Sequence, residues 1–265
     1  MTTLLLPPRH TDDSRLIWRA AVAAGWSTLR LPAWHVPSDI ETRDLAFYGE
    51  PLLAAHVAEV LRLKLIEPRL DWLVTLPQDY VRRKVYASTL GQARQLSHRA
   101  FIKPADDKAF RAAVYESGRH LDASHLYHES LMVLISEPVE FRLEYRFFVL
   151  DRGAETYSLY ARNGELVEFA EGYEPDNDPY GQHALAFAKS VLSDESVYFP
   201  PAVVFDIGLL ADGEWAVIEC NPCWGSGIYG CDPTCILSVL KRACVPFELT
   251  AGYDPQAFVD RAQSG

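Results

Sequence analysis

The segment that most limits the possible folds is 203–221, two apolar stretches with Asp212-Gly213 between them. An Asp-Gly dipeptide flanked by apolar stretches favours a tight turn, so the segment is predicted to form a β-hairpin. If the turn has two residues, Asp206 on the first strand lies directly opposite Glu219 on the second. Two carboxylates are therefore expected to face each other in an otherwise apolar hairpin.

The facing carboxylates of Asp206 and Glu219 indicate a bound cation. Cross-strand Cβ atoms are about 5 Å apart, so the two charges repel unless a positive charge lies between them. Asn221 shares their face, because strand side chains alternate, and it adds an amide oxygen. Ligands that are all oxygens suit Mg²⁺. The alternative, from the hairpin alone, is that one carboxylate is solvated or has its own Arg or Lys partner.

Two cationic side chains lie at apolar strand patterns upstream of the hairpin. Lys103 ends the apolar stretch 100–103 directly before Pro104, where its ammonium either contacts a phosphate or is simply solvated. Arg146 has hydrophobic neighbours on a predicted strand. It is expected to pair with Glu144 on the same face or to stabilise a transferred phosphoryl group.

The first 77 residues alternate between short apolar strands and amphipathic helices, which predicts a small α/β domain that opens with a βαβ unit. The expected strands are 3–6, 26–31, 45–48 and 63–66, and the expected helices are 13–24 and 51–62. No Gly-x-Gly-x-x-Gly or Walker loop accompanies them, so a nucleotide bound in those two ways is not indicated in this region.

The rest of the chain changes pattern at a hinge near 136–139. Before the hinge we expect helices 78–97 and 107–119 with strands 100–103 and 131–135. After it, a period of two predicts an antiparallel meander. The expected elements there are strands 145–150, 156–160, 166–169, 202–210 and 214–221 and helices 182–193 and 233–243.

The net charge and the apolar runs exclude several classes of partner. The formal charge is −11 and the pI is about 5.2, so nucleic acid is not an expected partner. No apolar run approaches the ~20 residues that span a bilayer, and the apolar run near Met1 is too short for a signal peptide. We therefore expect a cytoplasmic protein without a membrane partner.

The five cysteines all lie between 220 and 244, and their odd number argues against a secreted disulfide framework. The spacings Cys220-x-x-Cys223 and Cys231-x-x-x-Cys235 would permit a zinc site. Buried free thiols are the simpler expectation, since Cys220 lies in an apolar strand pattern.

Six motifs follow one another along the chain: Lys84, Phe101-Ile-Lys103-Pro104, Ser136-Glu137-Pro138-Val139, Glu144-Tyr-Arg146-Phe-Phe-Val, Asp206 and Ile218-Glu219-Cys-Asn221-Pro222. Their order resembles the ATP-grasp superfamily. More narrowly, four stretches look like the ATP-grasp clade named for two arginines and a lysine, over roughly 78–245. These are Arg83-Lys84-Val85, Lys103-Pro104-x-x-x-Lys108-x-Phe110, Ser136-Glu137-Pro138-Val139 and Tyr229-Gly230.

The resemblance implies an α/β (α+β) fold in which an ATP-grasp unit follows a small βαβ domain and holds the nucleotide between two subdomains. Residues 1–77 would form the preceding domain. Residues 78–136 would form the lid subdomain, and residues 137–265 would form the catalytic subdomain.

The resemblance also implies roles for individual residues. Lys84 and Lys103 would contact phosphates, the main chain of Glu137 and Val139 would meet adenine, and Arg146 would steady the phosphoryl group. Mg²⁺ would be held by Asp206, Glu219 and Asn221. The glycine-rich phosphate loop is replaced by Ala105-Asp106-Asp107-Lys108, so Lys108 is expected to take over part of its contact.

The activity implied is ATP-dependent joining of a carboxylate to an amine through an acyl phosphate, with release of ADP. Small molecules or peptides are the expected substrates, and the sequence is silent on oligomeric state. Two alternatives stay open: phosphoryl transfer to a hydroxyl, and a nucleotide-binding module without turnover.

Overall fold

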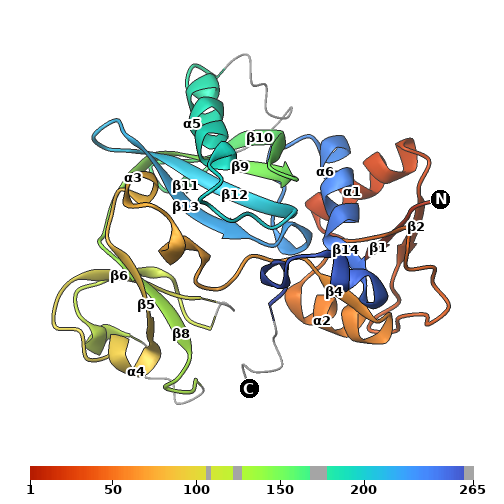
Figure 1. Ribbon diagram of the computed structural model, residues 1–265, viewed down its shortest axis with the longest axis horizontal. Coiled ribbons are helices and arrows are strands. Elements are labelled where there is room, and N and C mark those ends of the chain that lie inside the picture. Colours follow the sequence, from red (N-terminus) through yellow and green to blue (C-terminus); the bar gives the residue numbers. More distant parts are fainter. Residues whose placement is uncertain (106–108, 122–126, 168–177, 260–265) are drawn as a thin grey trace.

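A computed structural model describes residues 1–105, 109–121, 127–167 and 178–259, and its strands form four sheets around three hydrophobic cores (Figure 1). The mixture of helices and sheets confirms the predicted α/β (α+β) class. None of the helices within these ranges is both long and apolar enough to cross a bilayer.

The N-terminal unit is a parallel sheet in the order β2-β1-β3, as the βαβ pattern predicts. Helix α1 connects β1 to β2, and its start is fixed by a capping box between Thr11 and Ser14. The unit comprises β1 (Thr3–Leu6), α1 (Asp12–Ala23), β2 (Ser27–Arg30), β3 (Leu45–Phe47), α2 (Pro51–Val60) and β4 (Leu63–Leu65).

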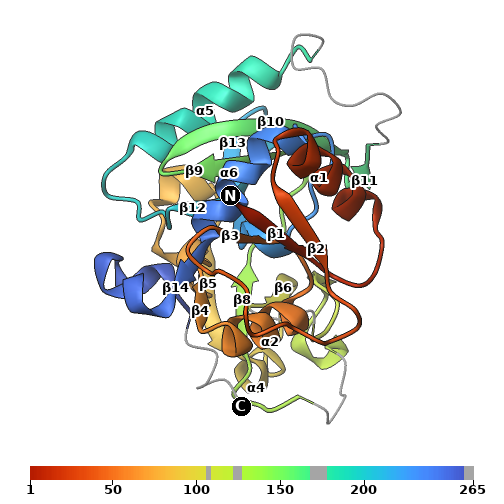
Figure 2. The ribbon, with the colours of Figure 1, turned by 90° about the vertical axis from the view of Figure 1, so that its right-hand side faces the viewer.

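The C-terminal part of the chain returns to this N-terminal unit. Helix α6 (Pro233–Ala243) buries Ile236 and Leu240 in the same core as Leu4 and Phe47. Strand β14 (Cys244–Pro246) pairs with β4 in antiparallel fashion. Figure 2 shows α6 and β14 beside the first strands. Segments from the two ends of the described chain therefore share one core.

The central sheet is antiparallel, in the order β11-β10-β9-β12-β13, and both faces are covered. Phe147 and Phe205 point into a core with α5, whereas Phe148 and Val204 point into the core that contains α6. The elements are β9 (Phe141–Leu150), β10 (Gly153–Arg162), β11 (Glu165–Leu166), α5 (Gly181–Ser193), β12 (Ala202–Leu210) and β13 (Trp215–Asn221).

The third unit is a four-stranded sheet in the order β5-β8-β6-β7, with its own core around Ile102, Val133 and Ile135. We call it the lid sheet. It lies apart from the N-terminal sheet in Figure 1. The unit comprises α3 (Gln78–Val81), β5 (Val85–Thr89), α4 (Leu90–Ala93), β6 (Ala100–Pro104), β7 (Ala113–Tyr115) and β8 (Met132–Ser136).

The two helices predicted at 78–97 and 107–119 are wrong. The first is interrupted by β5, which pairs with β8, and the second is replaced by β7, which pairs with β6. Residues 106–108 lie outside the described ranges. Both strands are short and lie at the edges of the sheet. Pairing with a neighbouring strand outweighs local helix preference there, and a single sequence does not reveal the partner strand.

The hairpin β12–β13 places Asp206 directly opposite Glu219, as predicted. The turn is not the expected two-residue turn, because the Leu210 N–H donates to the Glu214 carbonyl at 2.8 Å around a three-residue loop. The resulting shift in register is corrected by a bulge next to Asp206, at Ile218. The predicted pair is therefore produced by the bulge rather than by the turn.

Candidate functional site

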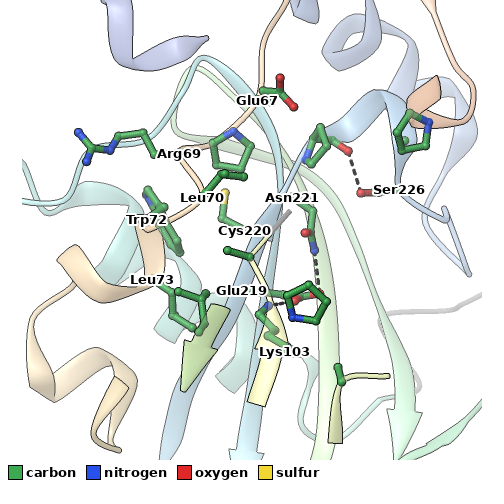
Figure 3. A pocket seen from close by; sticks show the side chains of 18 of the residues that line it. Glu67, Arg69, Leu70, Trp72, Leu73, Lys103, Glu219, Cys220, Asn221 and Ser226 are labelled. Atoms are coloured by element: carbon green, nitrogen blue, oxygen red, sulfur yellow. Dashed lines mark hydrogen bonds and ion pairs between the residues drawn. The ribbon is translucent and has the colours of Figure 1, made fainter. Parts of the chain in front are cut away.

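A cavity of about 830 Å³ lies between the lid sheet, the central sheet and the segment 67–73 (Figure 3). Four of the predicted site residues meet there from two sheets: Lys103 from β6, Arg146 from β9, and Glu219 and Asn221 from β13. The cavity thus gathers charged and amide side chains beside apolar ones such as Leu73.

Glu219 is held between a lysine and an amide. The Lys103 Nζ lies 2.5 Å from Glu219 Oε2, and Asn221 Nδ2 donates to Glu219 Oε1 at 2.7 Å. The Glu219 side chain is still 29% exposed. Burial alone would raise the pKa of Glu219, but the charge and hydrogen bond of Lys103 outweigh it and bring the pKa to about 2. Glu219 is therefore an ionised oxygen donor open to the cavity.

This lowered pKa predicts how stability depends on pH. The folded-state pKa is below the ordinary value of 4.5, so the pair contributes its full stability above about pH 5 and loses it as the pH falls towards 2. The free energy of unfolding of the wild type should therefore fall by about 2 kcal/mol more than that of Glu219→Gln between pH 6 and pH 3. Urea unfolding at several pH values measures this difference. Parallel curves for the two proteins would contradict the ion pair.

Asp206 lies behind the cavity and is bound by Arg146. Arg146 Nε donates to Asp206 Oδ1 at 2.9 Å and Arg146 Nη2 to Oδ2 at 2.6 Å, while the Asp206 side chain is fully buried. The partner of Arg146 is thus Asp206, its neighbour across the strands, and not Glu144. Burial alone would lower the pKa of Arg146, but Asp206 outweighs it and raises the pKa, so the guanidinium stays charged.

Two aromatic rings complete the surroundings of Arg146. Its guanidinium carbon lies 5.3 Å from the ring centre of Tyr160 and 4.9 Å from that of Tyr229, and the two rings stack on each other. The Tyr160 hydroxyl donates to Glu144 at 2.8 Å. Tyr229 belongs to a motif that the sequence analysis identified. The contact of Tyr160 with Arg146 was not predicted, because nothing in the sequence of its strand marks it.

Arg83 is a second site residue whose structural part the sequence did not predict. It is buried and donates to the carbonyls of Val217 at 2.8 Å and Ile218 at 3.3 Å, the two residues at the bulge that sets Glu219 opposite Asp206. Burial lowers the pKa of Arg83 to about 10. The segment before the lid sheet is thereby attached to the strand that carries Glu219.

Three predicted nucleotide residues do not line the cavity. The Lys84 side chain is 82% exposed, with its Nζ 4.0 Å from Glu137. The Lys84 N–H donates to the Glu137 carboxylate at 2.8 Å, and the Glu137 N–H donates to the Lys84 carbonyl at 3.0 Å. Val139 is half-buried beyond the end of β8. None of the three lines the cavity with Lys103, and their roles stay predictions. A fourth, Lys108, lies outside the described ranges.

The five cysteines are free thiols, and Cys223, Cys231 and Cys244 are buried. Burial raises the pKa of Cys231 and of Cys244 to about 12, so both stay protonated. Among the residues described, no three His, Cys, Asp or Glu side chains gather as a metal site. The cysteine spacings do not form a zinc cluster within that part of the chain.

Solved structures of other proteins share this fold at low sequence identity. A RimK domain ATP-grasp protein from Sphaerobacter thermophilus is 17% identical with a TM-score of 0.55, over 91% of this chain and 99% of that one. The D-cycloserine synthetase DcsG is 16% identical with a TM-score of 0.54, over 90% and 98%. N5-carboxyaminoimidazole synthetase from Staphylococcus aureus is 11% identical with a TM-score of 0.51, over 93% and 78%. No curated protein matches the chain.

The sequence profile of one protein family matches residues 80–239, which is more than half of the chain. The family is the second ATP-grasp domain family of the clade named for two arginines and a lysine. The match includes Lys103, Arg146, Asp206, Glu219 and Asn221 and confirms the resemblance inferred from the motifs. This chain therefore belongs to the two-arginine, one-lysine clade of the ATP-grasp superfamily.

Proposed function

We propose that the protein is an ATP-dependent carboxylate–amine ligase that forms an amide or peptide bond through an acyl phosphate and releases ADP. The observation that carries the proposal is the meeting of Lys103, Arg146, Glu219 and Asn221 at one cavity between two sheets. Membership of the ATP-grasp superfamily supports it. Two proteins of similar fold are named as synthetases, which agrees with it.

The chemistry of the donors fits a hard divalent cation. Glu219 is ionised and faces the cavity beside the Asn221 amide, and carboxylate and amide oxygens are preferred ligands of Mg²⁺. We therefore propose that Glu219 and Asn221 hold Mg²⁺, which would offset the negative charge of ATP. Both carboxylate oxygens of Asp206 accept hydrogen bonds from Arg146, so the structure supports Asp206 less than Glu219 and Asn221 as a ligand of Mg²⁺.

The positions of Lys103 and Arg146 indicate how the chain would assist the reaction. Lys103 and Arg146 place two positive charges on the cavity wall, where charge on a transferred phosphoryl group would be stabilised in a site of low dielectric constant. A carboxylate oxygen would attack the terminal phosphorus of ATP, and the bond to ADP would break. The amine would then attack the acyl carbon, phosphate would leave, and the amine proton would pass to solvent.

The same proposal assigns work to the three parts of the chain. Residues 78–136 would act as the lid, 137–265 as the catalytic subdomain and 1–77 as the preceding domain. Adenine would meet the main chain at Glu137 and Val139, with Lys84 and Lys108 reaching the phosphates on closure of the lid. The substrates would be small molecules or peptides that carry a carboxylate and an amine.

The reaction class is tested by the products. With ATP, Mg²⁺ and pooled amino acids or peptides, we expect ADP rather than AMP. ADP release should require a carboxylate and an amine together, because an acyl phosphate is trapped in a closed site until the amine arrives. Hydroxylamine should divert it to a hydroxamate, which mass spectrometry detects.

Other outcomes separate the alternatives. A stable phosphate ester without hydroxamate would replace the ligase by a phosphotransferase that acts on a hydroxyl. AMP as the product would contradict an acyl-phosphate route. Nucleotide binding without any turnover across the substrate pool would leave a binding module.

A further inference from the structure

The loop that follows β13, residues 222–230, is hydrogen-bonded to the N-terminal unit on both sides of Gly227. The Tyr48 hydroxyl donates to the Ser226 carbonyl at 3.0 Å, and the Ile228 N–H donates to Asp13 Oδ2 at 3.2 Å. Asp13 and Tyr48 also contact each other, since the Tyr48 hydroxyl lies 3.3 Å from Asp13 Oδ2. The two side chains and the loop therefore form one connected polar cluster.

Gly227, the residue between these two attachment points, binds Arg146. The Gly227 carbonyl accepts from Arg146 Nη1 at 3.0 Å, and this nitrogen is not used by the ion pair with Asp206. The carbonyl sits one residue after Ser226 and one before Ile228. Its direction is therefore fixed from both sides by the N-terminal unit.

The conformation of the next residue of the loop, Tyr229, explains why the loop needs these hydrogen bonds. Its φ is +47°, a left-handed conformation that is unfavourable for a tyrosine, and its ring lies over the Arg146 guanidinium at 4.9 Å. Unfavourable backbone conformations persist only where the surroundings hold them in place. The bond from Ile228 to Asp13 holds the residue directly before Tyr229.

Asp13 and Tyr48 are themselves held in place by the N-terminal unit. Asp13 lies in the first turn of α1, next to Ser14 of the capping box, and Tyr48 directly follows β3 and is 8% exposed. The next residue, Gly49, donates its N–H to the Trp224 carbonyl at 2.9 Å. Burial, with a further contribution from Asp13, raises the pKa of Tyr48, so the hydroxyl keeps its proton for Ser226.

We propose that Asp13 and Tyr48 are positioning residues for Arg146: they hold the Gly227 carbonyl and the Tyr229 ring, which set the guanidinium at the cavity wall. Neither residue lines the cavity, so they act through Arg146 rather than on a substrate. The part of this inference that concerns catalysis rests on the proposed function. The part that concerns the geometry of Arg146 does not.

The geometric part is tested by NMR of protein labelled with ¹⁵N-arginine, with the Arg146 signals assigned from their loss in Arg146→Lys. Asp13→Ala and Tyr48→Phe should each shift the Arg146 Nη signals and make their hydrogens exchange about tenfold faster, because Gly227 is no longer held as their acceptor. Asp12→Ala is the matched control for Asp13, since both are acidic residues of the same first turn. Tyr80→Phe, whose hydroxyl donates to Asp194, is the control for Tyr48.

The catalytic part is tested by ATP turnover, with the carboxylate found above or as basal hydrolysis to ADP. Asp13→Ala and Tyr48→Phe should lower kcat about 10- to 100-fold and leave KM for ATP within about twofold, whereas the controls should keep both values. In the Arg146→Lys background, Asp13→Ala should have little further effect on kcat, as expected for residues that act as a unit.

The outcomes separate this inference from the proposed function. Unchanged Arg146 signals in both Asp13→Ala and Tyr48→Phe would overturn the positioning relation whatever the reaction is. Shifted signals with unchanged kcat would show that Asp13 and Tyr48 hold the loop but do not contribute to catalysis. A wild-type protein without any ATP turnover would defeat the proposed function, and the NMR comparison would still decide the geometry.

Discussion

Replacing Arg146 by methionine is expected to lower the free energy of unfolding by about 3–5 kcal/mol. The Asp206 side chain has no exposed surface, and both of its oxygens accept hydrogen bonds from Arg146. The substitution leaves a buried carboxylate without its counter-charge, which is far more costly than the loss of an exposed pair. Urea unfolding of the two proteins at neutral pH gives the difference.

Two further variants show whether the cost arises from the unpaired charge. Arg146→Met combined with Asp206→Leu should recover most of the stability, since apolar side chains can replace a buried ion pair. Arg15→Met removes the partner of Asp12 on an exposed helix surface and should cost less than about 1 kcal/mol. Equal losses for Arg146→Met and the double variant would instead attribute the effect to packing.

Replacing Lys103 by alanine is expected to lower kcat/KM for ATP by about 30- to 1,000-fold, which corresponds to roughly 2–4 kcal/mol of lost interaction with a phosphate. Lys103 lies within β6 directly before Pro104, and its side chain is 20% exposed at the cavity. The same change removes the partner of Glu219, so the pKa of Glu219 should rise from about 2.

Steady-state kinetics and calorimetric titration with ATP test this expectation together. Lys103→Arg should retain part of the activity, because it keeps the charge but changes its shape. Lys189→Ala, on the exposed surface of α5, is the control for loss of one lysine and should match the wild type. Full activity and affinity in Lys103→Ala would make Lys103 a structural partner of Glu219 only.

The parts of the site that were predictable depend on local sequence rules. Strand alternation placed Glu219 and Asn221 on one face, and Pro104 marked Lys103 as the end of a strand. The prediction that Asp206 lies opposite Glu219 is correct, although the predicted two-residue turn is not. The bulge at Ile218 offsets the register shift that the three-residue loop introduces. A bulge leaves no reliable mark in a single sequence.

The parts that were missed depend on contacts between distant segments. Arg83 belongs to a motif in the sequence, and two of its hydrogen bonds in the structure go to carbonyls 134 and 135 residues away. Asp13 begins the predicted helix 13–24, and in the structure it also binds the loop at Ile228, 215 residues later. Backbone carbonyls and N–H groups are the same in every residue, so no sequence pattern marks them as partners.

The shared core of α6 with the first strands has a consequence for how the chain folds as it is made. Residues 3–65 leave the ribosome before residues 233–246, which form the helix that packs in the same core as Leu4 and Phe47 and the strand that pairs with β4. Until then an apolar sheet face and an unpaired strand edge are open to other chains. Nascent chains that stop before residue 233 should therefore need a chaperone to stay unaggregated, and release of that chaperone should follow the emergence of α6 from the ribosome.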